Sequence, residues 1–131
     1  MRSAHSALLA SFLMASSGLP GAQPAETRAA RVTLVVQSTR IAGFHHYDAA
    51  SVWDDLREGD SLELVREPDN RHDANAVRIE WRGRMLGYVP RRDNRALAWA
   101  LDSGQPLRAR IVHLQAHPNP ARRIALEITM E

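Results

Sequence analysis

The sequence predicts a mainly β domain, a small barrel or sandwich of about six short strands with one or two short helices. Short apolar runs recur from residue 31 onward, either β-branched or alternating with polar residues, as in half-buried strands. Between these runs stand Gly, Pro, Asn and Asp residues of the kind that form tight turns. Neighbouring short strands joined by tight turns favour a barrel or sandwich over a parallel α/β sheet.

The first part of this domain is expected to contain two strands and a short helical segment. Residues 31–39 form a β-branched run of strand length, which Gly43 interrupts. Residues 44–47 (Phe-His-His-Tyr) can resume it as a second short strand. The apolar spacing of residues 49–56 predicts one or two helical turns, which Gly59 ends.

The rest of the chain is expected to form five strands and one longer helix. The expected strands are residues 61–66, 76–81, 85–89, 107–114 and 122–130, and the expected helix is residues 91–101. A polar loop over residues 67–73 carries several turn-forming side chains. Arg82–Gly83 is a tight-turn signal between two of the strands.

The first 25 residues have the order of an export signal. Arg2 gives a positive start, residues 7–15 form an apolar run, and small or helix-breaking residues follow. The run is too short to span a bilayer, so no stable membrane insertion is expected. We therefore expect a signal peptide over residues 1–25, a linker over 26–31 and the folded domain over 32–131 of a secreted or periplasmic protein. The alternative is a mis-assigned start codon before a cytoplasmic domain.

The composition limits the chemistry that the chain can perform. It contains no cysteine, which excludes a disulfide framework and a thiolate zinc site. All 17 basic residues are Arg, whose planar guanidinium binds phosphate bidentately and stacks on bases. The net charge is only +2, so affinity for nucleic acid must come from local Arg clusters. No glycine-rich phosphate loop is present, which leaves nucleotide hydrolysis without support.

A long ordered motif occupies the centre of the chain. Its parts are Gly43 with the aromatic stretch to Tyr47, Gly59-Asp60, Leu64-Val65-Arg66-Glu67-Pro68-Asp69-Asn70, Asp73-Ala74-Asn75-Ala76-Val77 and Gly87-Tyr88-Val89-Pro90, followed by the expected helix. With these parts in this order, residues 33–115 resemble the HIRAN domain family. The resemblance implies an OB-like or SH3-like barrel.

The resemblance also implies a nucleic-acid-binding module, and the best-understood members of the family bind the 3′ end of single-stranded DNA. Base-stacking aromatic residues of the family lie in the stretch that ends at Tyr47, and its end-recognising polar groups lie in the loop that ends at Asp73. Carried over by position, the implied site residues are His45, His46, Tyr47, Asn70, His72, Asp73 and Tyr88.

Two positions depart from the pattern of the DNA-binding members. His45-His46 stands where these members favour a basic or aromatic pair, and His72 stands where they favour an aromatic residue. A histidine ring can stack on a base, and a protonated histidine can bind phosphate. A carboxylate such as Asp73 repels phosphate, so it suits a terminal hydroxyl, from which it can accept a hydrogen bond.

Several candidate residues also have a purely structural interpretation. Asn70 and Asp73 can cap their own loop, as Asx side chains often do. Tyr88 can be a residue of the barrel wall, and Gly87 is expected at a bulge or a close approach of two strands. The three tryptophans, Trp53, Trp81 and Trp99, are expected in the core.

The histidine and arginine residues of the domain also have alternative interpretations. On a strand, His45 and His46 would point to opposite faces, which disfavours joint metal chelation. A divalent-metal site from His45, His72 and Asp73 is a minor alternative, and no metal or cofactor is expected. His113 and His117 are expected to be exposed. Arg91, Arg92 and Arg95 open the expected helix against its dipole, which indicates either an anionic partner or a solvated face.

Taken together, these features predict a non-catalytic module that binds single-stranded nucleic acid. An envelope protein-interaction or structural domain is the second hypothesis, and it predicts that the His46–Tyr47 and Asn70–Asp73 regions lie apart or that their groove is filled. A metal-assisted phosphoester hydrolase is the third, but the sequence lacks paired carboxylates and a clear ligand set. A protein partner and the oligomeric state stay open.

Overall fold

The structure is a computed structural model that describes Gly18, Gly21 and residues 34–130. The chain divides into two units, Met1–Arg31 and Val32–Glu131, and the description below concerns the second. Apart from the two glycines, the expected signal peptide and linker lie outside the described residues.

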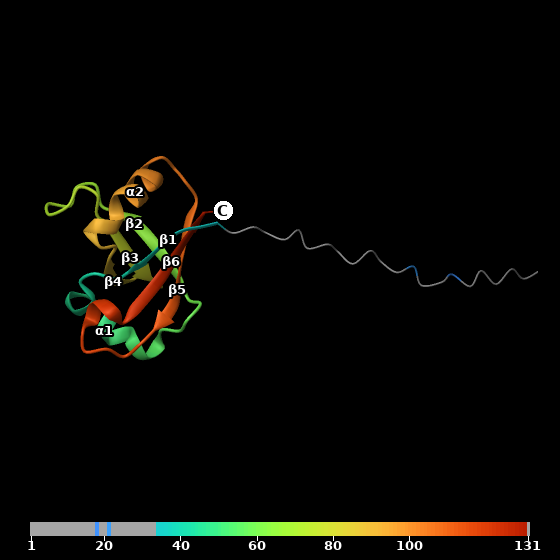
Figure 1. Ribbon diagram of the computed structural model, residues 1–131, viewed down its shortest axis with the longest axis horizontal. Coiled ribbons are helices and arrows are strands. Elements are labelled where there is room, and N and C mark those ends of the chain that lie inside the picture. Colours follow the sequence, from blue (N-terminus) through green and yellow to red (C-terminus); the bar gives the residue numbers. More distant parts are fainter. Residues whose placement is uncertain (1–17, 19–20, 22–33, 131) are drawn as a thin grey trace, which may run out of the picture. The chain divides into compact units, whose positions relative to one another are not determined.

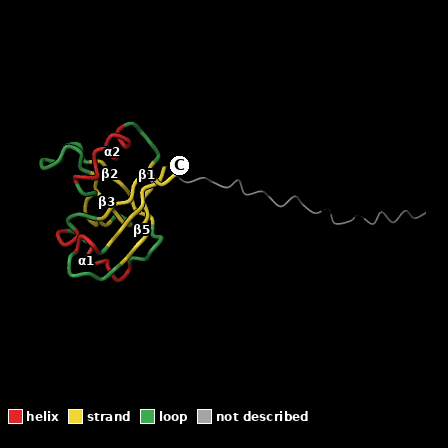
Figure 2. The backbone as a smooth tube through the Cα atoms, viewed as in Figure 1, coloured by secondary structure: helices red, strands yellow, loops and turns green. Residues whose placement is uncertain are grey.

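Residues 34–130 form six antiparallel strands connected by short helices and turns (Figure 1). The strands are β1 (Leu34–Arg40), β2 (Ser61–Arg66), β3 (Val77–Trp81), β4 (Arg84–Tyr88), β5 (Leu107–Leu114) and β6 (Ile124–Met130). The α-helices are α1 (Ala49–Val52) and α2 (Arg91–Asp102), and the 3-10 helices are η1 (Phe44–His46), η2 (Trp53–Asp55) and η3 (Pro120–Arg122). The mainly β prediction is confirmed. Figure 2 shows α1 and α2 at opposite ends of the strands.

The sheet has the strand order β1-β6-β5-β2-β3-β4, and a bridge between Ala42 and Tyr88 joins its two ends. The main-chain N–H of Ala42 donates to the carbonyl of Tyr88 at 2.8 Å, and the N–H of Tyr88 donates back at 3.0 Å. Gly87, the residue before Tyr88, has φ +152°, and a Cβ at this position would overlap the carbonyl oxygen of Ala42. Only glycine therefore fits at position 87. The expected close approach at Gly87 therefore closes the barrel.

The core fills the barrel as the alternation of apolar residues predicts. Alternate residues of β3 and β6 point inward, and they are buried: Val77, Ile79, Trp81, Ile124, Leu126 and Ile128. Burial of each large aliphatic side chain contributes roughly 1.5–3 kcal/mol. No helix among residues 34–130 is long and apolar enough to cross a bilayer.

The expectation that all three tryptophans are core residues is wrong for Trp99. Trp81 is buried, and its indole N–H donates to Asp60 at 3.1 Å. Trp53 is half-buried and packs edge-on against Phe44, with ring centroids 5.8 Å apart. Trp99 is 70% exposed, because the buried face of α2 carries Leu97 and Ala98 instead.

Residues 44–46 form the 3-10 helix η1, so the prediction of a second short strand there is wrong. Gly43 has a left-handed φ of +74°, and the N–H of His46 donates to its carbonyl at 2.9 Å. This turn buries Phe44, which an extended strand at the barrel surface would not do. The imidazoles of His45 and His46 consequently lie next to each other, with centroids 3.9 Å apart, and do not point to opposite faces.

Several boundaries differ from the expected ones by one or a few residues, and two of the differences follow from the local structure. The helical segment that starts at Ala49 ends at Asp55, before Gly59 is reached. β6 begins at Ile124 and not at residue 122, because Pro120–Arg122 forms η3. The side chain of Asn119 caps this turn by accepting a hydrogen bond of 3.0 Å from the N–H of Ala121.

Candidate nucleic-acid interface

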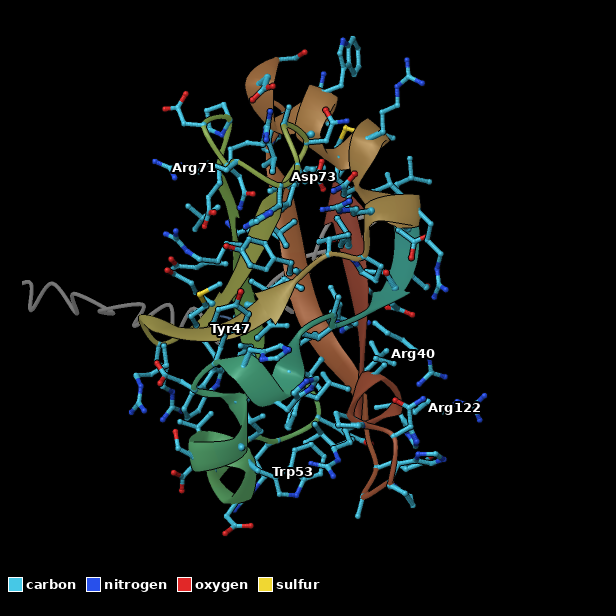
Figure 3. The ribbon with its side chains drawn as sticks, turned by 90° about the vertical axis from the view of Figure 1, so that its left-hand side faces the viewer. Arg40, Tyr47, Trp53, Arg71, Asp73 and Arg122 are labelled. Carbon is cyan, nitrogen blue, oxygen red and sulfur yellow. The ribbon has the colours of Figure 1, made fainter. Side chains whose placement is uncertain are left out.

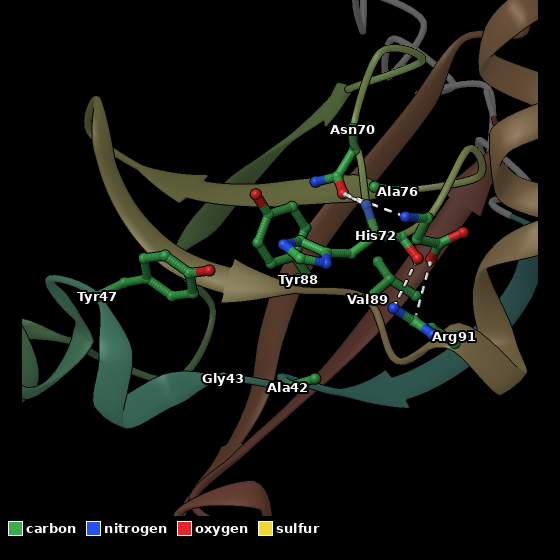
Figure 4. Close-up of a pocket in the computed structure, with 10 residues that line it drawn as sticks. Ala42, Gly43, Tyr47, Asn70, His72, Ala76, Tyr88, Val89 and Arg91 are labelled. Carbon is green, nitrogen blue, oxygen red and sulfur yellow. Dashed lines mark hydrogen bonds and ion pairs between the residues drawn. The ribbon is translucent and has the colours of Figure 1, made fainter.

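A pocket of about 300 Å³ opens where the barrel closes (Figure 4). Its wall comes from the residues on either side of η1, the loop between β2 and β3, the end of β4 and the start of α2. The lining residues are Ala42, Gly43, Tyr47, Asn70, His72, Asp73, Ala76, Tyr88, Val89 and Arg91. Five of the seven implied site residues therefore meet in one place, whereas His45 and His46 are exposed and do not line the pocket.

Two tyrosine rings form the aromatic part of the pocket. The rings of Tyr47 and Tyr88 are edge to face, with centroids 5.6 Å apart and planes at 73°. Tyr47 is 38% exposed, whereas Tyr88 is half-buried as part of the barrel wall. Tyr88 thus belongs both to the wall and to the pocket, and the two rings offer faces on which an apolar or aromatic ligand group can lie.

The loop between β2 and β3 is held by its own side chains. Asn70 Oδ1 accepts hydrogen bonds from the main-chain N–H groups of His72 at 2.9 Å and Asp73 at 3.2 Å. Asp73 Oδ1 accepts a bond of 2.9 Å from the N–H of Asn75. Asn70 and Asp73 therefore do cap their loop, and this capping sets the direction in which both side chains reach the pocket.

The carboxylate of Asp73 is positioned from below by a buried amide. Asn94 is 2% exposed, and its Nδ2 donates to Asp73 Oδ2 at 2.6 Å. Arg91, one turn earlier in α2, donates from Nη2 to the carbonyl of His72 at 2.7 Å, and its Nε lies 3.9 Å from Asp73 Oδ2. The carboxylate of Asp73 and the guanidinium of Arg91 therefore lie together at the pocket wall.

Arg91 was not among the residues that the sequence assigned to the site. The sequence did single it out with Arg92 and Arg95 as one of three basic residues that open the helix. It directly follows the Gly-Tyr-Val-Pro segment of the motif, and this position could have indicated that Arg91 lies near the site. Only the packing of α2 against the loop shows that Arg91 alone of the three lines the pocket.

Glu67 links the parts of the pocket from behind. Its Oε1 accepts hydrogen bonds from Tyr88 Oη at 2.9 Å and Asn70 Nδ2 at 3.0 Å, and its Oε2 pairs with Arg78 Nη1 at 2.7 Å. Burial alone would raise the pKa of Glu67, but the bonds from Asn70, Tyr88 and Arg78 outweigh it and lower this pKa below 4.5. Burial, followed by the hydrogen bond to Glu67 and the charge of Glu67, raises the pKa of Tyr88 to about 12. The Tyr88 hydroxyl therefore stays protonated and acts as a hydrogen-bond donor to Glu67.

The remaining histidines do not gather into a ligand set. Within residues 34–130, no group of three or more His, Asp and Glu side chains has a metal-binding arrangement. His72 and Asp73 line the pocket, but His45 does not. His113 is exposed, as expected, and its Nδ1 lies 3.4 Å from Glu58 Oε1. His117 is half-buried, contrary to expectation, and its Nδ1 accepts the N–H of Asn119 at 2.9 Å.

These features define a small antiparallel β-barrel module with a polar and aromatic pocket at the closure of the barrel. The family model of the HIRAN domain matches residues 34–131, and the chain belongs to this family. The resemblance that the central motif indicated is thereby confirmed, and it extends to the end of β6.

Three known proteins are similar to this chain. The Fanconi-associated nuclease 1 homolog of Oryza sativa subsp. japonica is 40% identical over 72 residues, which are 52% of this chain and only 7% of that protein. A crystal structure of a Lactobacillus plantarum protein has a TM-score of 0.66 at 24% identity and covers 76% of this chain and 95% of its own. The HIRAN domain of human HLTF has a TM-score of 0.58 at 20% identity, with 72% and 73% covered. The two structures share the fold.

Proposed function

We propose that this chain is a nucleic-acid-binding module whose pocket receives the 3′ end of a single-stranded DNA. Membership of the HIRAN family supports a nucleic-acid-binding module. One observation carries the finer proposal. A single pocket combines two tyrosine rings, the guanidinium of Arg91 and the carboxylate of Asp73, which match the base, the phosphate and the terminal hydroxyl of a strand end.

The aromatic side chains supply the binding energy for the base. A single-strand groove uses rings on which bases stack, and each stacked base contributes about 1–3 kcal/mol. Tyr47 is the more exposed of the two tyrosine rings, and the imidazole of His72 adds a third planar group to the same wall. The pocket volume of about 300 Å³ lies at the small end of the range for ligand sites. It therefore suits a terminal nucleotide and not a longer segment.

Arg91 supplies the contact to a phosphate. A guanidinium has five N–H donors, so the bond to the carbonyl of His72 leaves donors for a further acceptor. The side chain is 70% exposed, which leaves it accessible to a strand that enters from solvent. A charge-assisted pair between arginine and phosphate is stronger than a neutral hydrogen bond.

Asp73 supplies the preference for an end. Its carboxylate repels the phosphates of a continuous strand but accepts a hydrogen bond from a free hydroxyl. Asn94 and the N–H of Asn75 hold the two carboxylate oxygens in place, and the side chain is 18% exposed. Such a fixed, partly accessible acceptor can recognise a free 3′ hydroxyl by accepting its hydrogen bond.

The test is fluorescence anisotropy of the purified full chain with a labelled single-stranded DNA decamer. We expect Tyr47→Ala and Arg91→Ala each to weaken binding about fivefold or more, since each removes a stacking face or a charged donor. Arg95→Ala is the matched control, because it removes an equal charge from the same helix outside the pocket. Absence of binding by the unaltered chain at low salt, or equal losses in all three variants, would contradict the proposal.

The envelope-domain hypothesis predicted a different arrangement. It required the His46–Tyr47 and Asn70–Asp73 regions to lie apart, or the groove between them to be filled. Tyr47 and the Asn70–Asp73 loop instead line one open pocket. This geometry favours a ligand-binding module.

A further inference from the structure

A second group of basic side chains gathers outside the pocket, where the end of β1 meets η3. It consists of Arg40 at the end of β1, Arg122 in η3 and Arg123 just before β6, and we call it the arginine cluster. Arg40 Nη1 donates to the carbonyl of Arg122 at 3.1 Å, across a sequence separation of 82 residues. Figure 3 shows Arg40 and Arg122 beside each other at the surface of the domain.

The arginine cluster has no acidic partner in the part of the chain that the structure describes. Elsewhere on the surface, arginines are paired with carboxylates, as in Arg66–Asp102 at 3.0 Å and Arg84–Asp48 at 3.2 Å. Within residues 34–130, none of the three arginines of the cluster forms an ion pair with an Asp or Glu. Like charges held together without a counter-charge repel one another, and an anionic ligand relieves that repulsion.

An aromatic side chain lies beside this positive charge. Arg123 is half-buried, its guanidinium carbon lies 5.4 Å from the centre of the Phe44 ring, and its Nε donates to the carbonyl of His117 at 2.8 Å. Trp53, Ala116, His117, Pro118 and Arg123 line a shallow hollow of about 500 Å³. The half-buried indole of Trp53 and the guanidinium of Arg123 thus share one surface.

A row of rings leads from the pocket toward this surface. The ring centroids of Tyr88 and Tyr47 are 5.6 Å apart, those of Tyr47 and His46 are 6.4 Å apart, and those of His46 and His45 are 3.9 Å apart. Phe44, which precedes His45 in η1, is buried beneath Arg123 and packs against Trp53, so η1 connects the exposed rings to the arginine cluster. Successive rings with arginine beside them are the elements of a track for a single strand.

We propose that the arginine cluster binds the phosphates of the strand whose end occupies the pocket, a few nucleotides away from that end. This inference rests on the proposed function and adds a second site to it. The histidine pair then lies along the track between the two sites, which gives these exposed rings a place in the interface outside the pocket. The ligand is accordingly a strand of several nucleotides and not an isolated terminal nucleotide.

The experiment compares a short and a long ligand, both with a free 3′ hydroxyl. Thymidine dinucleotide and a thymidine decamer compete with a labelled decamer for the full chain. Arg40→Ala combined with Arg122→Ala is the test variant. Arg123 is kept because it packs on Phe44. Arg92→Ala combined with Arg95→Ala is the control, since it removes the same charge from α2, outside both the pocket and the arginine cluster. Circular dichroism checks that both variants fold.

We expect the test variant to bind the decamer about tenfold more weakly and the dinucleotide unchanged. The slope of log affinity against log salt for the decamer should fall by about 1.4 in magnitude, because each lost phosphate contact removes about 0.7 on a single strand. The control variant should change decamer binding far less.

Three results overturn the inference while leaving the proposed function in place. They are an unchanged decamer affinity in the test variant, equal losses for dinucleotide and decamer, and equal losses in the test and control variants. In each case the pocket variants would still weaken the dinucleotide. Failure of the unaltered chain to bind either ligand overturns both the proposed function and this inference.

Discussion

The hydroxyl of Tyr88 donates a hydrogen bond of 2.9 Å to the carboxylate of Glu67, and this bond joins the barrel wall to the loop that shapes the pocket. Glu67 also accepts a bond from Asn70 in that loop and pairs with Arg78 on β3. One ionised carboxylate therefore connects Tyr88 of β4, the loop at Asn70 and Arg78 of β3. The pocket depends on a group that does not line it.

Glu67→Gln tests this dependence through pH. The variant should lose about 1–2 kcal/mol of unfolding free energy at pH 7, because it replaces charge-assisted bonds with neutral ones. The folded-state pKa of Glu67 lies below 4.5, so its stabilisation is present above that value and is lost as the pH falls through the folded pKa. The difference between the unaltered chain and the variant should therefore shrink as the pH is lowered below 4.5. Urea unfolding at pH 7 and at a series of acidic pH values measures it, and an unchanged difference would contradict this role.

Asn94→Ala removes the buried amide that holds Asp73. We expect a loss of about 1–3 kcal/mol of unfolding free energy, because the carboxylate loses a donor at 2.6 Å and keeps little access to water. Binding of a strand with a free 3′ hydroxyl should also weaken. Denaturant unfolding and anisotropy measure the two effects. Asn75→Ala is the control, since Asn75 is exposed and contributes its main-chain N–H. Equal effects of the two substitutions would contradict the role of Asn94 in positioning the Asp73 carboxylate.

Gly87→Ala should be among the most harmful single substitutions in the barrel. The added Cβ would overlap the carbonyl oxygen of Ala42 and separate the bridge that closes the sheet. With the positive φ added, we expect a loss of about 3 kcal/mol or more, measured by thermal or denaturant unfolding. Gly83→Asn is a matched control, because Gly83 also has a positive φ but has open space around it. A stable Gly87→Ala protein would contradict the assigned closure.

Much of the barrel was predictable because strands such as β3 alternate between buried and less buried residues, and because the turns carry specific residues. Arg82 and Gly83 both have a positive φ, as the expected tight turn between β3 and β4 requires. The segment 44–47 was misjudged because a short aromatic run fits a strand as well as a turn. What decides between them is the burial of Phe44 against Trp53 and Arg123, a tertiary effect without a local signal.

The candidate site divides in the same way. Five of the residues that the motif implied, Tyr47, Asn70, His72, Asp73 and Tyr88, line one pocket, and their part in binding stays a prediction. It did not separate Arg91 from the two arginines that follow it, because helix phase relative to a loop depends on packing. The arginine cluster could not be predicted from the sequence, because residue spacing does not reveal a contact between β1 and η3 across 82 residues. The exposure of Trp99 was not predicted either, because its apolar character alone does not show which face of α2 it occupies.

We propose that residues 1–25 direct export of the protein. Expression in a Gram-negative host should place the protein in the periplasmic fraction, with its new N-terminus at Gln23 or Glu26, as intact mass measures. Leu13→Arg, which interrupts the apolar run, should retain the full-length chain in the cytoplasm. Recovery of the unaltered chain at full length from the cytoplasm would support a mis-assigned start instead.

The central claim is tested most directly by the chemistry of the strand end. Anisotropy compares two decamers of identical sequence, one with a free 3′ hydroxyl and one with a 3′ phosphate, at equal salt. The account predicts that the phosphate weakens binding about tenfold, because it faces the carboxylate of Asp73, and that Asp73→Asn narrows this difference. Equal affinity for the two decamers would contradict recognition of the 3′ end by this pocket.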